Sequence, residues 1–307
     1  MQTRRYLVLS DIHSNATALW AVIRASFRTF HPHVVVVAGD IVGYDLRADM
    51  PLFIQKGSWL ANAAGVTIAL GDDTGIENTF YGYGEHREFL EFGASQYREL
   101  QAYARELGVD FFATAFDIAS ATFLHDFDMP AYKIASGDLK STPLLKFVAA
   151  LGKPLIISTG GATIEDVQRA YDVIMPINPQ LAILQCTAGY PAAFHELDLR
   201  VISTYRDRFP GAVVGFSSHD NGIAMPVAAY MLGARVVEKH FTLNRASKGT
   251  DHAFSLEPVG LRKMVRDLDR TFQALGDGVK KIYESERAPI LKMGKSLVVA
   301  RDLPSGH

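Results

Sequence analysis

Two short apolar runs, VVGFSSHDNG at residues 213–222 and VVEKHFTL at residues 236–243, decide the fold class of this chain. Each run opens with β-branched side chains and leads to a histidine, His219 in the first and His240 in the second. Short apolar runs that are rich in valine and bounded by polar residues predict buried strands. An amphipathic stretch separates the two runs, and strands that alternate with helices pair in parallel.

Six further runs extend this pattern toward the N-terminus. They are YLVLS from Tyr6, VVVVAG from Val34, DFFAT from Asp110, AYKIAS from Ala131, PLIIST from Pro154 and LAILQC from Leu181. Eight strands that alternate with helices predict an α/β chain folded as a (β/α)8 TIM-type barrel. One more run, GVTIAL from Gly65, predicts a strand outside this repeat.

Helix signals lie between the predicted strands. Residues 95–107 form an amphipathic stretch that stops at Gly108, and the helical spacing of apolar residues 261–275 stops at Gly276. Glycine often follows the end of a helix, because it adopts positive φ without strain. Thr163 and Asp166 have the spacing of a capping box at the start of another helix.

The composition favours a small-molecule partner. The 307 residues include 31 basic and 33 acidic side chains, so no charge excess predicts binding to nucleic acid or to an anionic membrane. Cys186 is the single cysteine, which excludes an internal disulfide and gives no sign of secretion. The apolar run before Asp11 is too short for a signal peptide, and no run approaches the length of a membrane span. We expect a soluble, cytoplasmic protein.

The two histidines fall where a barrel carries its chemistry. The carboxyl ends of barrel strands form the open mouth of the fold. His219 and His240 end the seventh and eighth predicted strands, so we expect their side chains to be neighbours. Two converging neutral imidazoles form half of a coordination shell for a divalent metal. The alternative is that each ring only hydrogen-bonds a loop carbonyl, and the two histidines alone leave both interpretations open.

Polar side chains also end the other predicted strands. These residues are Thr114, Lys133, Ser136, Ser158, Thr187 and the nearby Tyr190. Hydroxyl groups and an ammonium group together can bind a phosphate or a carboxylate. A single hydroxyl near a loop more often makes a local hydrogen bond, but polar ends on successive strands favour an anion site.

Longer motifs follow one another in collinear order across residues 89–307. They are FFATAFD, AYKIASGDLKSTPLL, GKPLIISTGGATIED, LQCTAGYP, LRVISTYRDRFP, GFSSHDNGIA, VVEKHFTLNRASKGTDHAFSLEP and GKSLVVARDLP. Together they resemble the sialic acid (N-acetylneuraminate) synthase family. The resemblance implies a transferase of carbohydrate biosynthesis that joins phosphoenolpyruvate to an N-acetylhexosamine, either N-acetylmannosamine or its 6-phosphate.

The resemblance also implies roles for individual residues. The positions that bind phosphoenolpyruvate match Thr114, Lys133, Ser136, Ser158 and Ser217, and the pair that holds manganese or magnesium matches His219 and His240. The catalytic and sugar-contacting positions match Lys133, Glu238, Tyr190 and Asp251. In the implied reaction the metal polarises the sugar aldehyde, the enol carbon attacks it, water adds and phosphate leaves by C–O cleavage.

Both ends of the chain depart from this family. The AEIGxNHxG-like and VKFQ-like segments of the family's first two strands are absent, and Asp11 is the candidate replacement for the first-strand glutamate. SLVVARDLPSGH resembles the opening of the family's antifreeze-like lid domain. We therefore expect an atypical β-α-β unit with an insertion over residues 1–88, a barrel over residues 89–290 and a truncated lid domain over residues 291–307. A homodimer is expected by analogy, and impaired synthesis is one hypothesis.

Residues 1–45 resemble a second family. RYLVLSDIHSNATALWAVI and VVVVAGDIVGYD are similar to the opening of calcineurin-like metallophosphoesterases, whose metal ligands match Asp11, His13 and Asp40. That family's later GN[HD] and GHxH segments are missing. Three functions therefore compete: a phosphoenolpyruvate-dependent synthase, a metal-dependent phosphoesterase and a non-catalytic barrel that binds an anionic sugar. Five matching phosphoenolpyruvate positions and both histidines favour the synthase.

Overall fold

The computed structural model describes residues 92–106, 108–246, 251–298, 300, 302 and 304–306, together with the backbone of four short N-terminal strands. The chain divides into two compact units, Met1–Asp269 and Arg270–His307. The division falls inside a helix, so it does not test the predicted limits at residues 88 and 290, which stay predictions.

Eight parallel strands form the sheet of the first unit. They are β1 (Tyr6–Ser10), β2 (Val34–Val37), β5 (Asp110–Phe111), β6 (Tyr132–Ile134), β7 (Leu155–Ser158), β8 (Leu181–Cys186), β9 (Val213–Ser218) and β10 (Val236–His240). Each coincides with one of the eight predicted runs. Their order is β5-β2-β1-β10-β9-β8-β7-β6, and every pairing is parallel.

The two outermost strands of this order are linked to each other. Thr114, just after β5, forms a parallel bridge with Lys133 of β6. The backbone N–H of Ala115 donates to the carbonyl of Lys133 at 3.0 Å. Because the bridge joins the two ends of the strand order, the topology is the one that the eight runs predicted for a (β/α)8 barrel.

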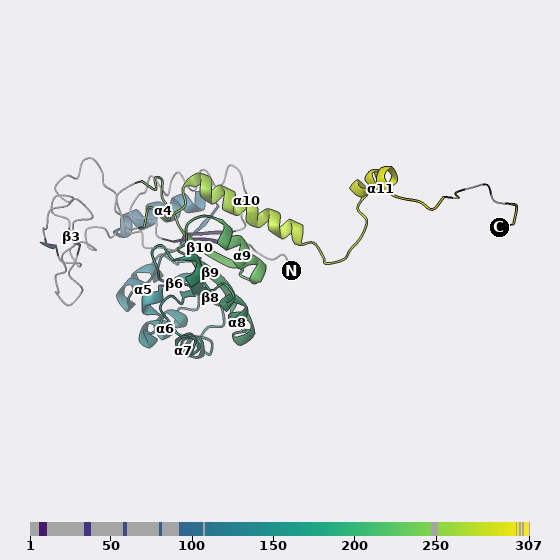
Figure 1. Cartoon of the computed structure of the whole chain (residues 1–307). Helices are drawn as coiled ribbons and strands as arrows, with labels where there is room; N and C mark the ends of the chain where they lie inside the picture. The colour runs from purple at the N-terminus through teal and green to yellow at the C-terminus, as the bar shows by residue number, and fades with distance from the viewer. Residues whose placement is uncertain are drawn as a thin grey trace. The chain divides into compact units, whose positions relative to one another are not determined.

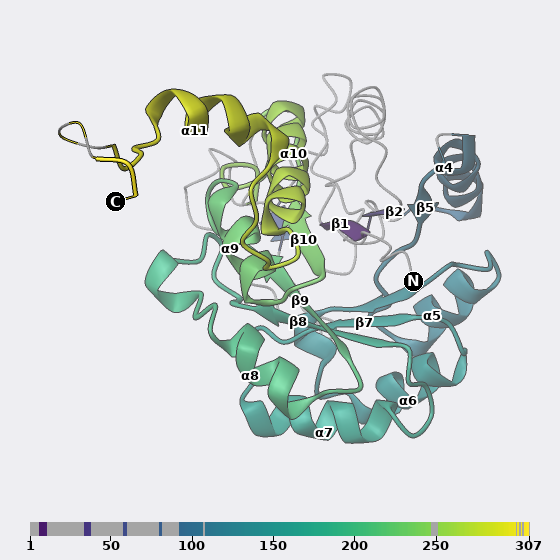
Figure 2. The ribbon, with the colours of Figure 1, turned by 90° about the vertical axis from the view of Figure 1, so that its right-hand side faces the viewer.

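Helices connect the strands and cover their outer side. They are α4 (Ala94–Glu106), α5 (Ile118–His125), α6 (Thr142–Ala150), α7 (Ile164–Ile174), α8 (Val201–Arg208), α9 (Ala224–Leu232) and α10 (Pro258–Leu275). Figures 1 and 2 show α5, α6, α7 and α8 following one another along the outside of the strands.

Local signals explain where these helices begin and end. Thr163 and Asp166 form the predicted capping box, in which each side chain accepts a hydrogen bond from the backbone of the other. Gly108 and Gly276 have φ values of +71° and +60°, in the left-handed region that glycine adopts without strain. All three helix signals are confirmed.

Burial on both faces explains why the strand sequences are continuous apolar runs. Every residue of β7 and β8 is buried. One side of such a strand faces the barrel interior and the other faces the helices, so both alternating faces lack water. Ile134, Ile157 and Ile183, on three neighbouring strands, are fully buried.

The N-terminal residues supply two strands of the sheet, as predicted. β1 lies between β10 and β2, and β2 pairs with β5. A separate pair of two-residue parallel strands is formed by β3 (Ser58–Trp59) and β4 (Phe80–Tyr81). The strand predicted from Gly65 lies outside the described residues.

The second unit contains the end of α10, a 3-10 turn η4 (Glu284–Glu286) and the short helix α11 (Arg287–Met293). Among its described residues, large apolar side chains such as Leu291 and Leu297 are exposed. In the described part of the whole chain, no helix combines the length and the apolar character that a membrane crossing needs.

A side chain at Gly215 would collide with both neighbouring strands. A Cβ atom there would lie 2.7 Å from the Val236 carbonyl oxygen and 2.8 Å from Val236 Cβ, and it would overlap Leu184. We expect Gly215→Ala to lower the free energy of unfolding by about 1–3 kcal/mol, because the strand backbone cannot move aside without strain. Urea unfolding followed by circular dichroism measures the change. The matched control is Gly137→Ala, whose Cβ would meet no described atom within 4 Å; equal losses in both variants would contradict the collision.

Candidate active site

A pocket opens at the carboxyl ends of the strands. The residues that line it are Thr114, Phe116, Lys133, Ala135, Ser136, Gly137, Ser158, Cys186, Tyr190, Ser217, His219, Glu238 and His240. Every residue that the resemblance to the sialic acid synthases assigned to the site is among them except Asp251, which lies beside His240. These residues are far apart in sequence, and they meet because parallel strands place their carboxyl ends at one edge.

A buried ion pair crosses the floor of the pocket. Lys133 Nζ on β6 lies 3.6 Å from Glu238 Oε2 on β10, and both side chains are about 95% buried. Lys133 Nζ also donates to the carbonyl of Ile134 at 3.0 Å, and Ser217 Oγ donates to Glu238 Oε1 at 2.8 Å. Glu238 Oε2 makes no hydrogen bond with any described residue. The pair therefore presents both a cationic donor and an anionic acceptor to a ligand.

Hydroxyl groups form the neighbouring wall. Ser158 Oγ is buried and makes no hydrogen bond with the described residues, so it has capacity for a ligand. Ser136 Oγ accepts from the backbone N–H of Gly160 at 2.9 Å and lies 3.6 Å from Cys186 Sγ. Together with Lys133, these groups match the chemistry of a phosphate or carboxylate site.

One strand-end hydroxyl does not belong to the pocket. Thr187 Oγ1 donates to the carbonyl of Glu196 at 2.9 Å. The expectation that it offers a donor to an anion is therefore wrong. Its hydroxyl instead makes a local hydrogen bond within the loop, which is the more frequent role of a single hydroxyl near a loop.

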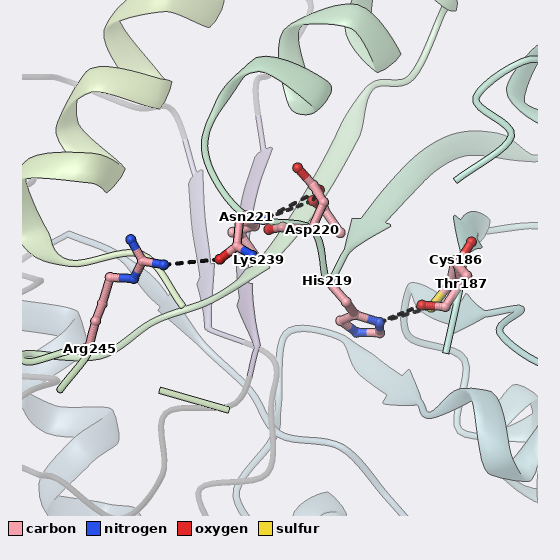
Figure 3. Close-up of polar contacts among 8 residues, drawn as sticks. Cys186, Thr187, His219, Asp220, Asn221, Lys239 and Arg245 are labelled. Carbon is pink, nitrogen blue, oxygen red and sulfur yellow. Dashed lines mark hydrogen bonds and ion pairs between the residues drawn. The ribbon is translucent and has the colours of Figure 1, made fainter. Parts of the chain in front are cut away.

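His219 and His240 are neighbours, as predicted. Their ring centroids lie 5.0 Å apart with an interplanar angle of 81°. His219 Nδ1 lies 2.7 Å from the Thr187 carbonyl oxygen, which Figure 3 shows as a dashed line. A carbonyl only accepts, so Nδ1 carries a proton, and in the neutral ring Nε2 keeps its lone pair. The hydrogen bond to a loop carbonyl is thus present, and it orients the ring as metal-binding histidines are commonly oriented.

The donor set of this pair fits part of a metal shell. Two imidazole rings whose centroids lie 5.0 Å apart are close enough to share one divalent ion. Within the described ranges, no group of three or more His, Cys, Asp or Glu side chains is placed to hold an ion. Among the described residues the pair thus supplies only part of a coordination shell, and water or substrate oxygens are ligands that can fill open positions of such a shell.

Asp251 and aromatic rings surround the two histidines. Asp251 Oδ2 lies 3.8 Å from His240 Nδ1. The Tyr190 ring stacks on His219 at 4.3 Å and 30°, and Phe254 lies 4.8 Å from the His240 ring, centroid to centroid. Tyr190 is half exposed, so it forms the rim of the pocket and can contact a ligand that enters.

Cys186 is a site residue that sequence reasoning missed. Its thiol lies 3.9 Å from His219 Nδ1. Burial raises the pKa of the Cys186 thiol, but contacts with His219, Ser136 and Ser217 together outweigh burial and lower it. Conversely, burial lowers the pKa of His219, but Cys186, the Thr187 carbonyl and Glu238 together raise it. The sequence did contain a signal for this role, because Cys186 is the last residue of the strand LAILQC and the predicted site residues also lie at strand ends.

The fold and the pocket together define a class of protein: a parallel α/β barrel whose polar site lies at the carboxyl ends of its strands. The model of the NeuB family matches residues 71–280, and the chain belongs to this family. The predicted relationship to sialic acid synthases is confirmed. The three metallophosphoesterase-like residues Asp11, His13 and Asp40 lie outside the described residues.

Relatives with known names share most of the barrel. N-acetylneuraminate-9-phosphate synthase of Mus musculus is 42% identical over 224 residues, which are 73% of this chain and 62% of the relative. N,N'-diacetyllegionaminic acid synthase of Campylobacter jejuni is 36% identical over 221 residues, which are 71% of this chain and 66% of the relative. The structure of spore coat polysaccharide biosynthesis protein SpsE from Bacillus subtilis superposes with a TM-score of 0.68 at 30% identity, covering 92% of this chain and 73% of that one. The chain thus spans less than two thirds of the mouse relative.

Proposed function

We propose that this chain condenses phosphoenolpyruvate with an N-acetylhexosamine, N-acetylmannosamine or its 6-phosphate, to form a sialic-acid-type nonulosonic acid. The observation that carries the proposal is the convergence of Lys133, buried hydroxyls and two histidines in one pocket. The names of the relatives support the reaction class, because they describe synthases of N-acetylneuraminate 9-phosphate and of diacetyllegionaminic acid.

The anion wall would hold phosphoenolpyruvate. Among the described residues that line the pocket, Lys133 is the only lysine or arginine. Its ammonium would donate to the phosphate or carboxylate, with Thr114, Ser136, Ser158 and Ser217 as the other donors. We assign binding of the sugar to Tyr190 and Asp251, which lie beside the two histidines. Phosphoenolpyruvate held by Lys133 and the hydroxyls would then have its enol carbon facing the sugar.

The histidine pair would hold manganese or magnesium, which when bound polarises the sugar aldehyde. In the reaction the enol carbon attacks the aldehyde carbon and the aldehyde oxygen gains a proton. Water then adds to the cationic carbon and loses a proton, which gives a hydroxyl group on that carbon. The C–O bond to phosphate breaks as this hydroxyl loses its proton and becomes the ketone oxygen, and inorganic phosphate leaves. We assign Glu238 Oε2 as the atom that takes the proton from this water, because it is buried in the pocket and makes no hydrogen bond with the described residues.

Phosphate release tests the function directly. We expect the protein to release inorganic phosphate from phosphoenolpyruvate with Mn²⁺ only when N-acetylmannosamine or its 6-phosphate is present. Mass spectrometry should then show a sugar extended by three carbons, and a chelator should stop the reaction. Phosphate release that does not depend on the sugar would contradict synthesis and favour a phosphoesterase. Binding of phosphoenolpyruvate without turnover would favour the non-catalytic barrel.

A further inference from the structure

A second buried ion pair lies behind the two histidines, outside the pocket. Lys239 Nζ lies 3.3 Å from Asp220 Oδ1, and the side chains are 0% and 1% exposed. Each of these residues directly adjoins a histidine of the pocket, because Asp220 follows His219 and Lys239 precedes His240. The pair therefore links the backbone segments that carry the two histidines.

Strand alternation explains why this pair faces away from the pocket. Ser217 and His219 line the pocket from β9 and its end, as do Glu238 and His240 from β10. Successive side chains of a strand point to opposite faces, so Ser218 and Lys239 point outward. Figure 3 shows the side chains of His219 and Asp220 leaving opposite sides of the same turn.

The ammonium of Lys239 is fully engaged with the turn after β9. It donates to Ser218 Oγ at 2.9 Å, to the backbone carbonyl of Asp220 and to Asp220 Oδ1. Ser218 Oγ in turn donates to Asp220 Oδ1. An ammonium group has three N–H donors. All three of Lys239 therefore donate to Ser218 and Asp220, the two residues on either side of His219.

A second contact holds the same turn from the other side. Arg245, in the loop after β10, donates from Nη2 to Asn221 Oδ1 at 3.0 Å. Its Nε donates to the Ala253 carbonyl at 2.7 Å, and its backbone N–H donates to Glu257 Oε1 at 3.0 Å. The turn that carries His219 is thus attached at two points, to Lys239 just before His240 and to Arg245 after it.

Stability alone does not account for such a pair. Desolvation of two charges offsets most of their attraction, and apolar side chains of similar volume are often equally stable in their place. Apolar side chains cannot form the hydrogen bonds by which Lys239 fixes the turn after β9.

We propose that Lys239 is a positioning residue that, through Asp220, sets the placement of His219 relative to His240 for a shared divalent cation. This inference depends on the proposed function at one point, which is that the divalent cation binds to His219 and His240. Loss of a group that hydrogen-bonds the ring of a metal-binding histidine commonly weakens metal affinity by about 10- to 100-fold. Lys239 and Asp220 hold the backbone on either side of His219 rather than its ring, and we expect an effect of the same order because both kinds of contact set where the coordinating nitrogen lies.

The test is Mn²⁺ affinity, measured by calorimetry on the full chain without substrates. The variant Lys239→Met with Asp220→Leu removes both charges together and leaves neither buried alone. We expect its Mn²⁺ affinity to fall by about 10- to 100-fold while its melting temperature stays close to that of the parent. Asp220→Asn, which keeps the shape of the side chain, should also weaken Mn²⁺ binding and serves if the double variant does not fold.

The matched control removes a buried hydrogen bond elsewhere in the barrel. Tyr205→Phe deletes the 3.1 Å contact between Tyr205 Oη and Thr159 Oγ1 and should leave Mn²⁺ affinity unchanged. Parental Mn²⁺ affinity in the folded Lys239 and Asp220 variants would overturn the positioning role. A parent chain that binds no Mn²⁺ would instead overturn the metal site itself, and with it this inference.

Discussion

Replacing Lys133 with methionine should abolish phosphoenolpyruvate binding and lower kcat/KM by at least about 10²–10³-fold. The ammonium is the single lysine or arginine charge among the described pocket residues, and it is held in place by Glu238 and by the Ile134 carbonyl. In a buried site a charged donor stabilises a phosphate or carboxylate far more than it would in water. Calorimetry with phosphoenolpyruvate measures the binding, and phosphate release measures the turnover.

The variant leaves Glu238 buried without its cation, so a folding control is needed. Lys133→Met with Glu238→Gln keeps the pocket neutral and should melt closer to the parent, yet still fail to bind phosphoenolpyruvate. Lys140→Met removes a more exposed lysine that pairs with Asp166 at 2.9 Å, and it should leave binding unchanged. Parental affinity for phosphoenolpyruvate in a folded Lys133→Met protein would exclude Lys133 from the anion site.

Removing both pocket histidines should eliminate Mn²⁺ binding. We expect the variant His219→Ala with His240→Ala to lose more Mn²⁺ affinity than the Lys239 and Asp220 variants, for which we expect a loss of about 10- to 100-fold. The reason is that this variant lacks the coordinating nitrogens themselves. Calorimetric titration with Mn²⁺ checks this, and circular dichroism verifies that the barrel remains folded. His195→Ala is the matched control, since that side chain is 84% exposed and does not line the pocket.

The same titration separates the two candidate metal sites. If the double histidine variant kept its Mn²⁺ affinity while Asp11→Ala with Asp40→Ala lost it, the cation would belong to the phosphoesterase-like segment. Loss in the histidine variant alone would assign it to the mouth of the barrel.

The sequence alone determined the order of elements and the edge at which the site forms. All eight apolar runs became strands of the parallel sheet, and Gly108, Gly276 and the Thr163 capping box marked helix limits correctly. These features are local: burial on both faces requires continuous apolar runs, and helix termini require particular residues. Once the strands are parallel, their carboxyl ends must share one edge, which is why the predicted site residues meet.

Only the tertiary structure decided which neighbours of those residues face the pocket. Ser217 and Ser218 are identical in type, yet one lines the pocket and the other bonds Lys239 behind it. Strand alternation establishes that they differ but not which one faces inward, because that depends on packing against β8 and β10. Likewise the Thr187 hydroxyl bonds its own loop while its carbonyl orients His219. Contacts between residues that are 19 or more positions apart, such as Lys239 with Asp220 or Cys186 with His219, have no local signature and exist only once the chain has folded.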